Sequence, residues 1–517
     1  MKSLHQNPIL WPALLLAFIS WLTTGEVSGQ ILFSNLHSFT PLANADGNQP
    51  NGGLTLADGT LYGTTATGGA TNGGGTIFAV STNGTGYTVL YNFSPGQFIY
   101  LTSSGTFVLT NFTGSNPNGD LVLSGNVLYG TTQGYPQDSG AVFAINTDGT
   151  GFTNIYTFSP TSNGGGGGIG IGGGGITGGG VGGNNLDGAN PRAGFILAGA
   201  TLYGTTAGGG VNGSGTVFKI NLDGTGFTSL MSFDPVTIIP ESNVSTPNST
   251  GAQPATRLVL VGSNLYGTTS KGGANGTGTA FVVSTNGTRF ADLHDFPALA
   301  PNTLALSPNA LTWSGSLLYG TTTGGGANGN GTLFALSLDG TAFATLTNFD
   351  AINGGFSPEG GLVMASNYLF GVTYSDALHS AGTVFVINTN GSGLDTVYRF
   401  SLSDGSGPNG LIMSGNVLYG ATASGGIGGA GTLFSIDPGT FRSHTIVYHP
   451  PLDITTLAGG VVLTWPTNDP AFLLQTTADP ADPSSWNPVT PAPAVAGNLF
   501  TITIPTSGPQ QFFRLAR

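Results

Sequence analysis

Few residues of this 517-residue chain could perform acid–base or metal chemistry. Cysteine is absent, which excludes disulfides, thiolate metal ligands and cysteine nucleophiles. Beyond residue 29 the chain has two glutamates, Glu241 and Glu359. Most aspartates lie in turn-like segments, where their side chains favour the local geometry. A pair of acids in different loops could support glycoside hydrolysis, but no spacing in the sequence indicates such a pair.

Asp376 and His379 form the one nearby acid–imidazole pair in a loop, and an ordinary surface substitution explains them better than a binding role does. Asn44, Asp46 and Asn48 have the alternate spacing of a calcium loop, but no glutamate follows. The histidines lack metal-ligand spacing, and no nucleophile elbow is present. We therefore predict no catalytic residue, metal or cofactor. Four aromatic residues in loops could stack on sugar rings: Phe98, Tyr100, Tyr135 and Tyr374.

Charge is sparse. The formal net charge is −13, from 23 acidic and 10 basic residues. Because the basic residues form no stripe, nucleic acid and anionic lipid surfaces are poor partners. Residues 1–29 read as a signal peptide with an apolar segment from Ile9 to Leu22, although an uncleaved anchor is the alternative. We expect a secreted or cell-surface protein that is monomeric and has no membrane span after cleavage.

The elements that would position any site are set by a repeated motif, Leu-Tyr-Gly-Thr-Thr. It occurs in exact or altered form seven times, at intervals of 49 to 74 residues. The aromatic residues of the seven copies are Tyr62, Tyr129, Tyr203, Tyr266, Tyr319, Phe370 and Tyr419. We assign them to packing between repeats, and we expect each following glycine to permit close approach of neighbouring sheets.

Each repeat predicts four strands, A to D. Strand B carries the motif, a glycine-rich loop leads to strand C, and an Asn-Gly or Asp-Gly turn leads to strand D in most copies, as at Asn83-Gly84. Four antiparallel strands in about 50 residues are typical of a propeller blade near the kelch period. A β-helix lacks such hairpins, and a single sandwich would not place seven similar units equivalently. The fold class predicted is all-β: a seven-bladed β-propeller, residues 30–448, with a β-sandwich after it.

Ring closure has two solutions. Residues 31–39 have the pattern of a strand D, so they could complete the last repeat. Alternatively, residues 441–448 complete that repeat and the N-terminal strand packs elsewhere. Residues 449–517 show about six short strands, which predict a small sandwich similar to fibronectin type III domains. We expect Trp465, Phe472, Leu474, Trp486, Phe500 and Phe512 to form its core.

The repeat resembles the Gloeobacter/Verrucomicrobia ("GloVer") repeat over residues 31–448. Its elements are a Pro-x-Gly-Gly-Leu segment, Leu-Tyr-Gly-Thr-Thr, a glycine loop, Gly-Thr-Val-Phe, Asp-Gly-Thr and a final Phe. The C-terminal segment, with Leu463-Thr464-Trp465-Pro466, resembles the short terminal domain of secreted verrucomicrobial proteins. This resemblance implies export and a bacterial repeat scaffold, and it implies no catalytic residue.

The antiparallel order of the strands indicates which face of the propeller carries function. The A–B and C–D turns share one face of an antiparallel blade, and the B–C and D–A loops share the other. All long insertions, including the run Gly164–Gly183 and the predicted hairpin at 98–112, fall on the second face, and loops on a rigid scaffold often carry function. We expect a non-catalytic module that binds a glycan or a cell-surface protein. The alternatives are a polysaccharide-acting enzyme that uses acids on the same face, and a purely structural spacer.

Overall fold

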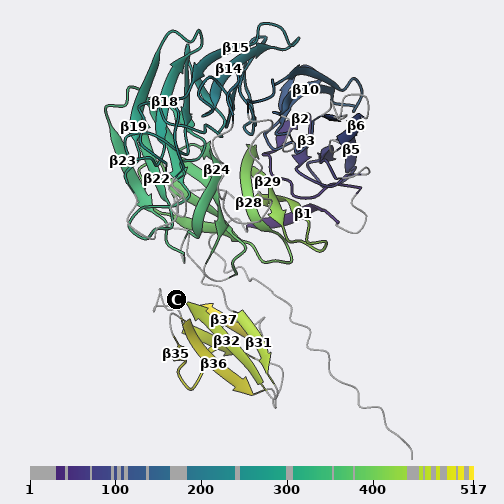
Figure 1. Cartoon of the computed structure of the whole chain (residues 1–517). Helices are drawn as coiled ribbons and strands as arrows, with labels where there is room; N and C mark the ends of the chain where they lie inside the picture. The colour runs from purple at the N-terminus through teal and green to yellow at the C-terminus, as the bar shows by residue number, and fades with distance from the viewer. Residues whose placement is uncertain are drawn as a thin grey trace, which may run out of the picture. The chain divides into compact units, whose positions relative to one another are not determined.

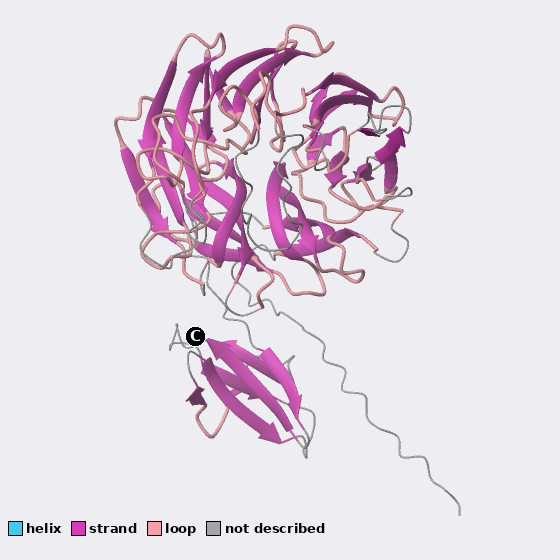
Figure 2. Cartoon of the chain, viewed as in Figure 1, coloured by secondary structure: helices cyan, strands magenta, loops and turns pink. Residues whose placement is uncertain are grey.

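The computed structural model is all-β in the residues it describes, and every statement below concerns these residues (Figure 2). They are 31–40, 45–69, 73–94, 98–101, 106–109, 114–134, 139–162, 183–238, 245–298, 307–351, 354–376, 379–438, 453–457, 460–466, 473–477, 486–496, 499–505 and 512–516. No helix in these segments is long and apolar enough to cross a membrane.

Residues 30–440 form one compact unit, in which the described strands build seven four-stranded antiparallel sheets. We number them I to VII in order of their strands A, B, C and D. Sheet I has β2 (Thr55–Ala57), β3 (Thr60–Thr65), β4 (Thr76–Ser81) and β5 (Thr88–Asn92). Sheet II has β8 (Val122–Ser124), β9 (Val127–Thr132), β10 (Ala141–Asn146) and β11 (Thr153–Thr157). Sheet III has β12 (Ile196–Ala198), β13 (Thr201–Thr206), β14 (Thr216–Asn221) and β15 (Thr228–Ser232).

The other four sheets follow the same order. Sheet IV has β16 (Val259–Val261), β17 (Asn264–Thr268), β18 (Thr279–Ser284) and β19 (Phe290–Asp295). Sheet V has β20 (Thr312–Ser314), β21 (Leu317–Thr322), β22 (Thr332–Ser337) and β23 (Phe343–Asn348). Sheet VI has β24 (Phe356–Ala365), β25 (Tyr368–Ser375), β26 (Thr383–Asn388) and β27 (Asp395–Arg399). Sheet VII has β28 (Ser406–Ser414), β29 (Val417–Ser424), β30 (Thr432–Asp437) and β1 (Leu32–Ser38).

The sheets stand around a centre like the blades of a propeller (Figure 1). Strands A such as β2, β24 and β28 lie toward the inside, and strands D such as β5, β19 and β23 lie toward the outside. An additional hairpin of β6 (Phe98–Leu101) and β7 (Thr106–Leu109) lies between sheets I and II in the sequence. This hairpin agrees with the one that the sequence predicts at 98–112.

Apolar residues fill the space between neighbouring sheets, because strands B and C are buried on both faces. Tyr62 of sheet I, for example, packs in one cluster with Leu121, Leu128 and Phe143 of sheet II. Motif residues of other sheets occupy equivalent clusters. Burial of large side chains contributes about 1.5–3 kcal/mol each, so a sheet is stabilised by having a neighbour on either side.

The motif glycine has a different role from the one expected. A Cβ on Gly63 would lie 2.5 Å from Cζ of Phe78 and 2.9 Å from Cδ2 of Leu54. Phe78 pairs with Gly63 across strands β3 and β4, and Leu54 directly precedes strand β2. The glycine therefore makes room for side chains of its own sheet, not for a neighbouring sheet.

The N-terminal strand completes the last sheet. β1 pairs antiparallel with β30, from Leu32 opposite Asp437 to Ser38 opposite Thr432. Sheet VII then packs on sheet I: His37 stacks on Tyr87 with ring centroids 3.7 Å apart, and Pro50 lies against Gly431. Of the two ways to close the ring, the structure has the one that uses residues 31–39. Residues 441–448 lie outside the described residues.

The C-terminal segment belongs to a second unit that contains residues 441–517. One sheet contains β31 (Asp453–Leu457), β32 (Gly460–Pro466), β36 (Leu499–Pro505) and β35 (Ala494–Ala496). The other contains β34 (Asn487–Pro488), β33 (Leu473–Thr477) and β37 (Phe512–Ala516). Leu463, Leu474 and Ile502 form its buried core, and Phe500 packs against them. Trp486 is half-buried, Phe472 lies outside the described residues, and the side chains of Trp465 and Phe512 are not among those described.

Candidate functional site

The two ends of the sheets differ in how much structure they carry. At the turn face, the A–B and C–D turns are short. Asp148, for example, accepts hydrogen bonds at Oδ1 from the backbone N and the Oγ1 of Thr150, at 2.9 and 2.7 Å. These hydrogen bonds lower the pKa of Asp148. At the loop face, the B–C loops and the D–A connections emerge together, and they vary from sheet to sheet.

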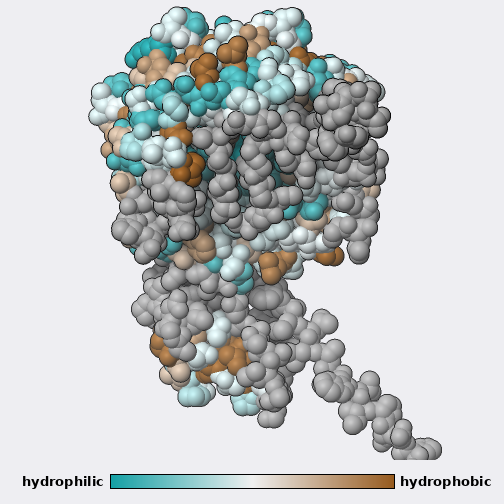
Figure 3. All heavy atoms as spheres, in the orientation of Figure 1, coloured by the Kyte–Doolittle hydropathy of each residue, from teal (hydrophilic) through white to brown (hydrophobic). Residues whose placement is uncertain are grey.

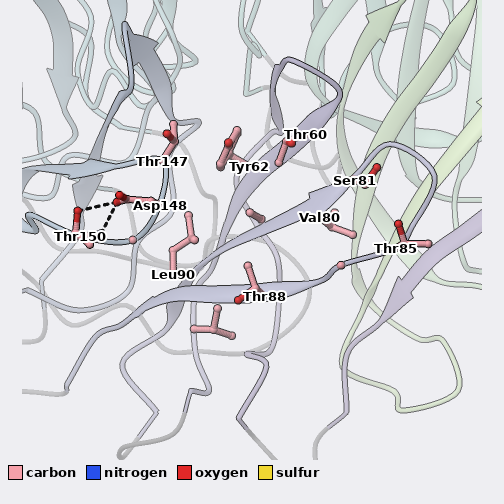
Figure 4. A pocket seen from close by; sticks show the side chains of 14 residues that line it. Thr60, Tyr62, Val80, Ser81, Thr85, Thr88, Leu90, Thr147, Asp148 and Thr150 are labelled. Atoms are coloured by element: carbon pink, nitrogen blue, oxygen red, sulfur yellow. Dashed lines mark hydrogen bonds between the residues drawn. The ribbon is translucent and has the colours of Figure 1, made fainter.

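An open hollow of about 530 Å³ lies at the turn face, between sheets I and II (Figure 4). Thr60, Tyr62, Thr88 and Leu90 line it, together with the turn that contains Asp148. The carboxylate of Asp148 is engaged by Thr150, so the lining offers hydroxyl and apolar groups rather than a group poised for acid–base chemistry. The sequence did not predict this hollow, because no motif marks it.

Hydrogen bonds from the end of strand D hold the glycine loops at the loop face in sheets III, IV and V, and we call this set of contacts the loop clamp. In each, a side chain at the end of strand D accepts a hydrogen bond from a loop backbone N, and a loop asparagine donates to the carbonyl of the final Phe. The first contacts are Val211 to Ser232 (3.1 Å), Ala274 to Asp295 (2.6 Å) and Ala327 to Asn348 (2.8 Å). The second are Asn212 to Phe233, Asn275 to Phe296 and Asn328 to Phe349.

Sheet VI departs from this scheme at three positions. Strand D ends in a donor, Arg399, whose Nη1 donates to Oδ2 of Asp376 at 2.5 Å. Both side chains are shielded from solvent, with exposed fractions of 10% and 0%. His379 takes the position of the loop asparagine, and its Nδ1 lies 3.9 Å from Oδ2 of Asp376. The predicted pair is thus brought together, but its carboxylate is bound to the guanidinium of Arg399.

The inner ends of the sheets form a second set of contacts at this face. In sheets V and VII the residue after a proline is an asparagine, and its side-chain N donates to the proline carbonyl of the next sheet. Asn309 donates to Pro358 at 2.6 Å, and Asn409 donates to Pro50. We call this contact the amide latch. It joins neighbouring sheets around the centre.

Glu359 occupies the latch position in sheet VI. Burial raises the pKa of Glu359 to about 7, so its carboxyl is partly protonated near neutral pH. Tyr374 of strand B lies close by, and its pKa is raised by burial and by the charge of Glu359. Its ring packs on the backbone of sheet VII, because a Cβ on Gly407 would lie 2.8 Å from Cε2 of Tyr374.

The turn-like aspartates before strands A serve the structure. Asp187 accepts at Oδ2 from the hydroxyl of Tyr156 and the backbone N of Ser159, both at 2.9 Å. Asp404 accepts from the hydroxyl of Tyr398 at 2.7 Å. In the segments described, no three His, Asp or Glu side chains are grouped closely enough to hold a metal ion. Asn44 of the calcium-like spacing lies outside those segments.

Comparison with known proteins adds a family to this geometry. Residues 300–464 match the Gloeobacter/Verrucomicrobia repeat. The match covers sheets V and VI, strands β28 to β30 of sheet VII and the start of the second unit, and it confirms the resemblance over these residues. No curated protein sequence matches the chain.

Solved structures of similar shape share little sequence with this repeat protein. An oligogalacturonate lyase in complex with manganese is 11% identical, with 78% of this chain and 92% of that chain covered and a TM-score of 0.46. An oligogalacturonate lyase from Vibrio parahaemolyticus is 8% identical, with 80% and 94% covered and a TM-score of 0.44. A puromycin-hydrolyzing peptidase of Mycobacterium tuberculosis is 12% identical, with 84% and 62% covered and a TM-score of 0.46. Likenesses at this level assign no function.

The residues predicted to bind ligand fall into two groups. Tyr374, Asp376 and His379 lie together at the loop face of sheet VI. Phe98 and Tyr100 lie in the β6–β7 hairpin, where only the backbone is described, and Tyr135 lies outside the described residues. Sequence reasoning missed Arg399. Its position in the repeat could have revealed it, because it directly precedes the final Phe of strand D. The other repeats carry Ser, Asn, Thr or Asp at this position.

Proposed function

We propose that this chain is a secreted or cell-surface seven-bladed β-propeller with a fibronectin type III-like domain after it, and that it is a non-catalytic binding module. The ligand, a glycan or a protein, is bound at the loop face. The signal-peptide pattern of residues 1–29 supports export. The seven similar sheets and the closing strand β1 support the blade count.

The observation that carries this proposal is a pair of exposed apolar side chains at the loop face, one in the connection between sheets VI and VII and one in the B–C loop of sheet VII. Leu402 is 67% exposed and Ile427 is 93% exposed. Their segments are joined by a hydrogen bond from the N of Gly426 to the carbonyl of Leu402, at 2.9 Å. Apolar groups held in water by rigid backbone are typical of binding surfaces. On the face visible in Figure 3, apolar residues are scattered among hydrophilic ones.

The ion pair between Asp376 and Arg399 favours a binding function over a catalytic one. A carboxylate that is fixed by a buried guanidinium supports the shape of a loop, and the energy of removing it from that partner is large. His379 has 31% of its side chain exposed, so its imidazole is accessible to a ligand at the loop face. Tyr374 and His379 offer aromatic and polar contacts at the same face.

The test is binding by the chain 30–517 on a glycan array and to purified cell-surface proteins. The double variant Leu402→Ser/Ile427→Ser is compared with Trp313→Ser, whose side chain is 46% exposed at the turn-face end of sheet V. We expect the double variant to lose at least tenfold in affinity and Trp313→Ser to bind normally. The opposite pattern would place the ligand at the turn face. An absence of any ligand in both panels would reject the binding module.

A second candidate function rests on Glu359. A carboxyl with a pKa of about 7 beside a tyrosine can act as a general acid near neutral pH. The alternative is therefore an enzyme that cleaves polysaccharides at the loop face. It predicts that the chain 30–517 depolymerises a soluble polysaccharide and that Glu359→Gln lowers kcat at least 100-fold with little change in KM. Equal activity of the two proteins would reject this role for Glu359.

A further inference from the structure

Arg192 occupies the position of the amide latch in sheet III, but it carries a positive charge instead of an amide. It directly follows Pro191 at the inner end of sheet III, where Asn309 and Asn409 stand in sheets V and VII. Pro191 packs in the usual way, since a Cβ on Gly140 of sheet II would lie 2.6 Å from its Cδ. The backbone therefore follows the repeat, and only the side chain differs.

The guanidinium of Arg192 turns back toward sheet II. In the amide orientation that satisfies both groups, the oxygen of Gln133 accepts from Nε at 3.2 Å and from Nη2 at 3.3 Å. Gln133 belongs to the B–C loop of sheet II, so this contact lies at the loop face. A neutral amide oxygen satisfies two of the five guanidinium hydrogens, and it leaves the positive charge uncompensated.

Among the residues that the structure describes, no carboxylate is seen to pair with the guanidinium of Arg192. Two described acids of sheets II and III are engaged elsewhere. Asp120 accepts from the N of Gly53 at 2.6 Å and lies 3.9 Å from Nη1 of Arg257, and Asp187 accepts from Tyr156 and Ser159. Burial lowers the pKa of Arg192 to about 10, which leaves the group charged at neutral pH. A largely buried cation without an anion is costly unless a ligand supplies one.

We propose that Arg192 and Gln133 form a binding site for the carboxylate of an acidic sugar, at the loop face between sheets II and III. The planar guanidinium matches a carboxylate with two parallel hydrogen bonds. The latch position carries Asn51 and Asn118 in sheets I and II. Their half-buried amides offer both donors and acceptors, which suits sugar hydroxyls better than an apolar peptide. This proposal rests on the proposed glycan-binding function and names its ligand class.

The experiment is isothermal titration of the chain 30–517 with oligosaccharides that contain glucuronic acid, beside neutral oligosaccharides of the same length and an acidic peptide. The variants are Arg192→Gln and Arg192→Lys. The matched control is Arg289→Gln, which removes the same charge from an exposed side chain at the turn face. Melting temperatures of all proteins establish that each variant is folded.

We expect the acidic oligosaccharide to bind, with affinity that falls as salt is added. Arg192→Gln should weaken it at least tenfold, Arg192→Lys by less, and Arg289→Gln by less than twofold. Equal binding by wild type and Arg192→Gln would overturn the inference. So would Arg192-dependent binding of the acidic peptide alone. Binding of neutral oligosaccharides without preference for acidic ones would overturn the inference and leave the proposed function standing, whereas binding of no probe would reject the inference and the glycan ligand together.

Discussion

The segments from Thr322 to Thr332 in sheet V and from Thr373 to Thr383 in sheet VI have the same length and join equivalent strands, but they are held by opposite chemistry. In sheet V the strand supplies the acceptor, Asn348, and the loop supplies a backbone N–H. In sheet VI the strand supplies the donor, Arg399, and the loop supplies a carboxylate, Asp376. The direction of the hydrogen bond in the clamp is therefore reversed in sheet VI, while the strands that carry the clamp keep their pairing.

This difference shows that a departure from a repeat has to be judged with its partners. Asp376 and His379 alone look like candidates for chemistry, because neither matches the other loops. With Arg399 in view, the three changes form one substitute for the clamp. Glu359, by contrast, replaces a latch asparagine, and no ion pair in the described residues joins it to a basic side chain. Sheet VI therefore contains one compensated change and one that carries a cost.

The largest expected effect breaks the reversed clamp. Arg399→Met leaves the buried carboxylate of Asp376 without its guanidinium partner, so we expect a loss of about 3–5 kcal/mol in the free energy of unfolding. Urea denaturation measures it. The double variant Asp376→Gly/Arg399→Asn, which restores the side chains of sheet V, should recover more than half of the loss. A single variant within about 1 kcal/mol of wild type would contradict the clamp.

A second change sharpens the contrast at the inner end of sheet VI. The pKa of Glu359 is raised from 4.5 to about 7, so folding favours its protonated form. Its cost to stability is absent below pH 4.5, grows as the pH rises, and is complete above pH 7. Glu359→Gln removes this cost, and we expect about 3 kcal/mol of added stability at pH 8 and no difference near pH 4.

The same measurement has an internal control. Asp292 of sheet IV also has a pKa raised to about 7, by burial and then by the neighbouring charge of Asp295. It titrates in the same range in both proteins, so it cancels from their difference. A pH-independent difference between Glu359→Gln and wild type would show that the carboxyl is solvated.

The smallest effect tests the ordinary clamp of sheet V. Asn348→Ala removes one neutral hydrogen bond to the N of Ala327, which costs about 1 kcal/mol. Thermal unfolding and hydrogen exchange at Ala327 measure it. If the cost approached that of Arg399→Met, the two clamps would not differ in the way their charges indicate.

Sequence reasoning predicts the strands well because the motif and the Asn-Gly and Asp-Gly turns recur at fixed distances within each repeat. It identified residues 31–39 as a strand D, but pairing between distant strands was needed to decide how the ring closes. It misplaced the role of Gly63, since the ring of Phe78 lies fifteen positions away in the sequence and beside it in the sheet. Arg399 and the orientation of Arg192 were missed for the same reason: their partners come from other strands or other sheets.

The pairing of β1 with β30 has a consequence for how the protein is made. It joins segments about 400 residues apart, so the strand synthesised first cannot reach its partner until nearly the whole unit has left the ribosome. Until then its edge stays open and sheet VII lacks its outer strand, a state prone to wrong pairing. The closing step is therefore a late and slow event in folding, and a chain interrupted before residue 432 has no site at which its first strand can dock.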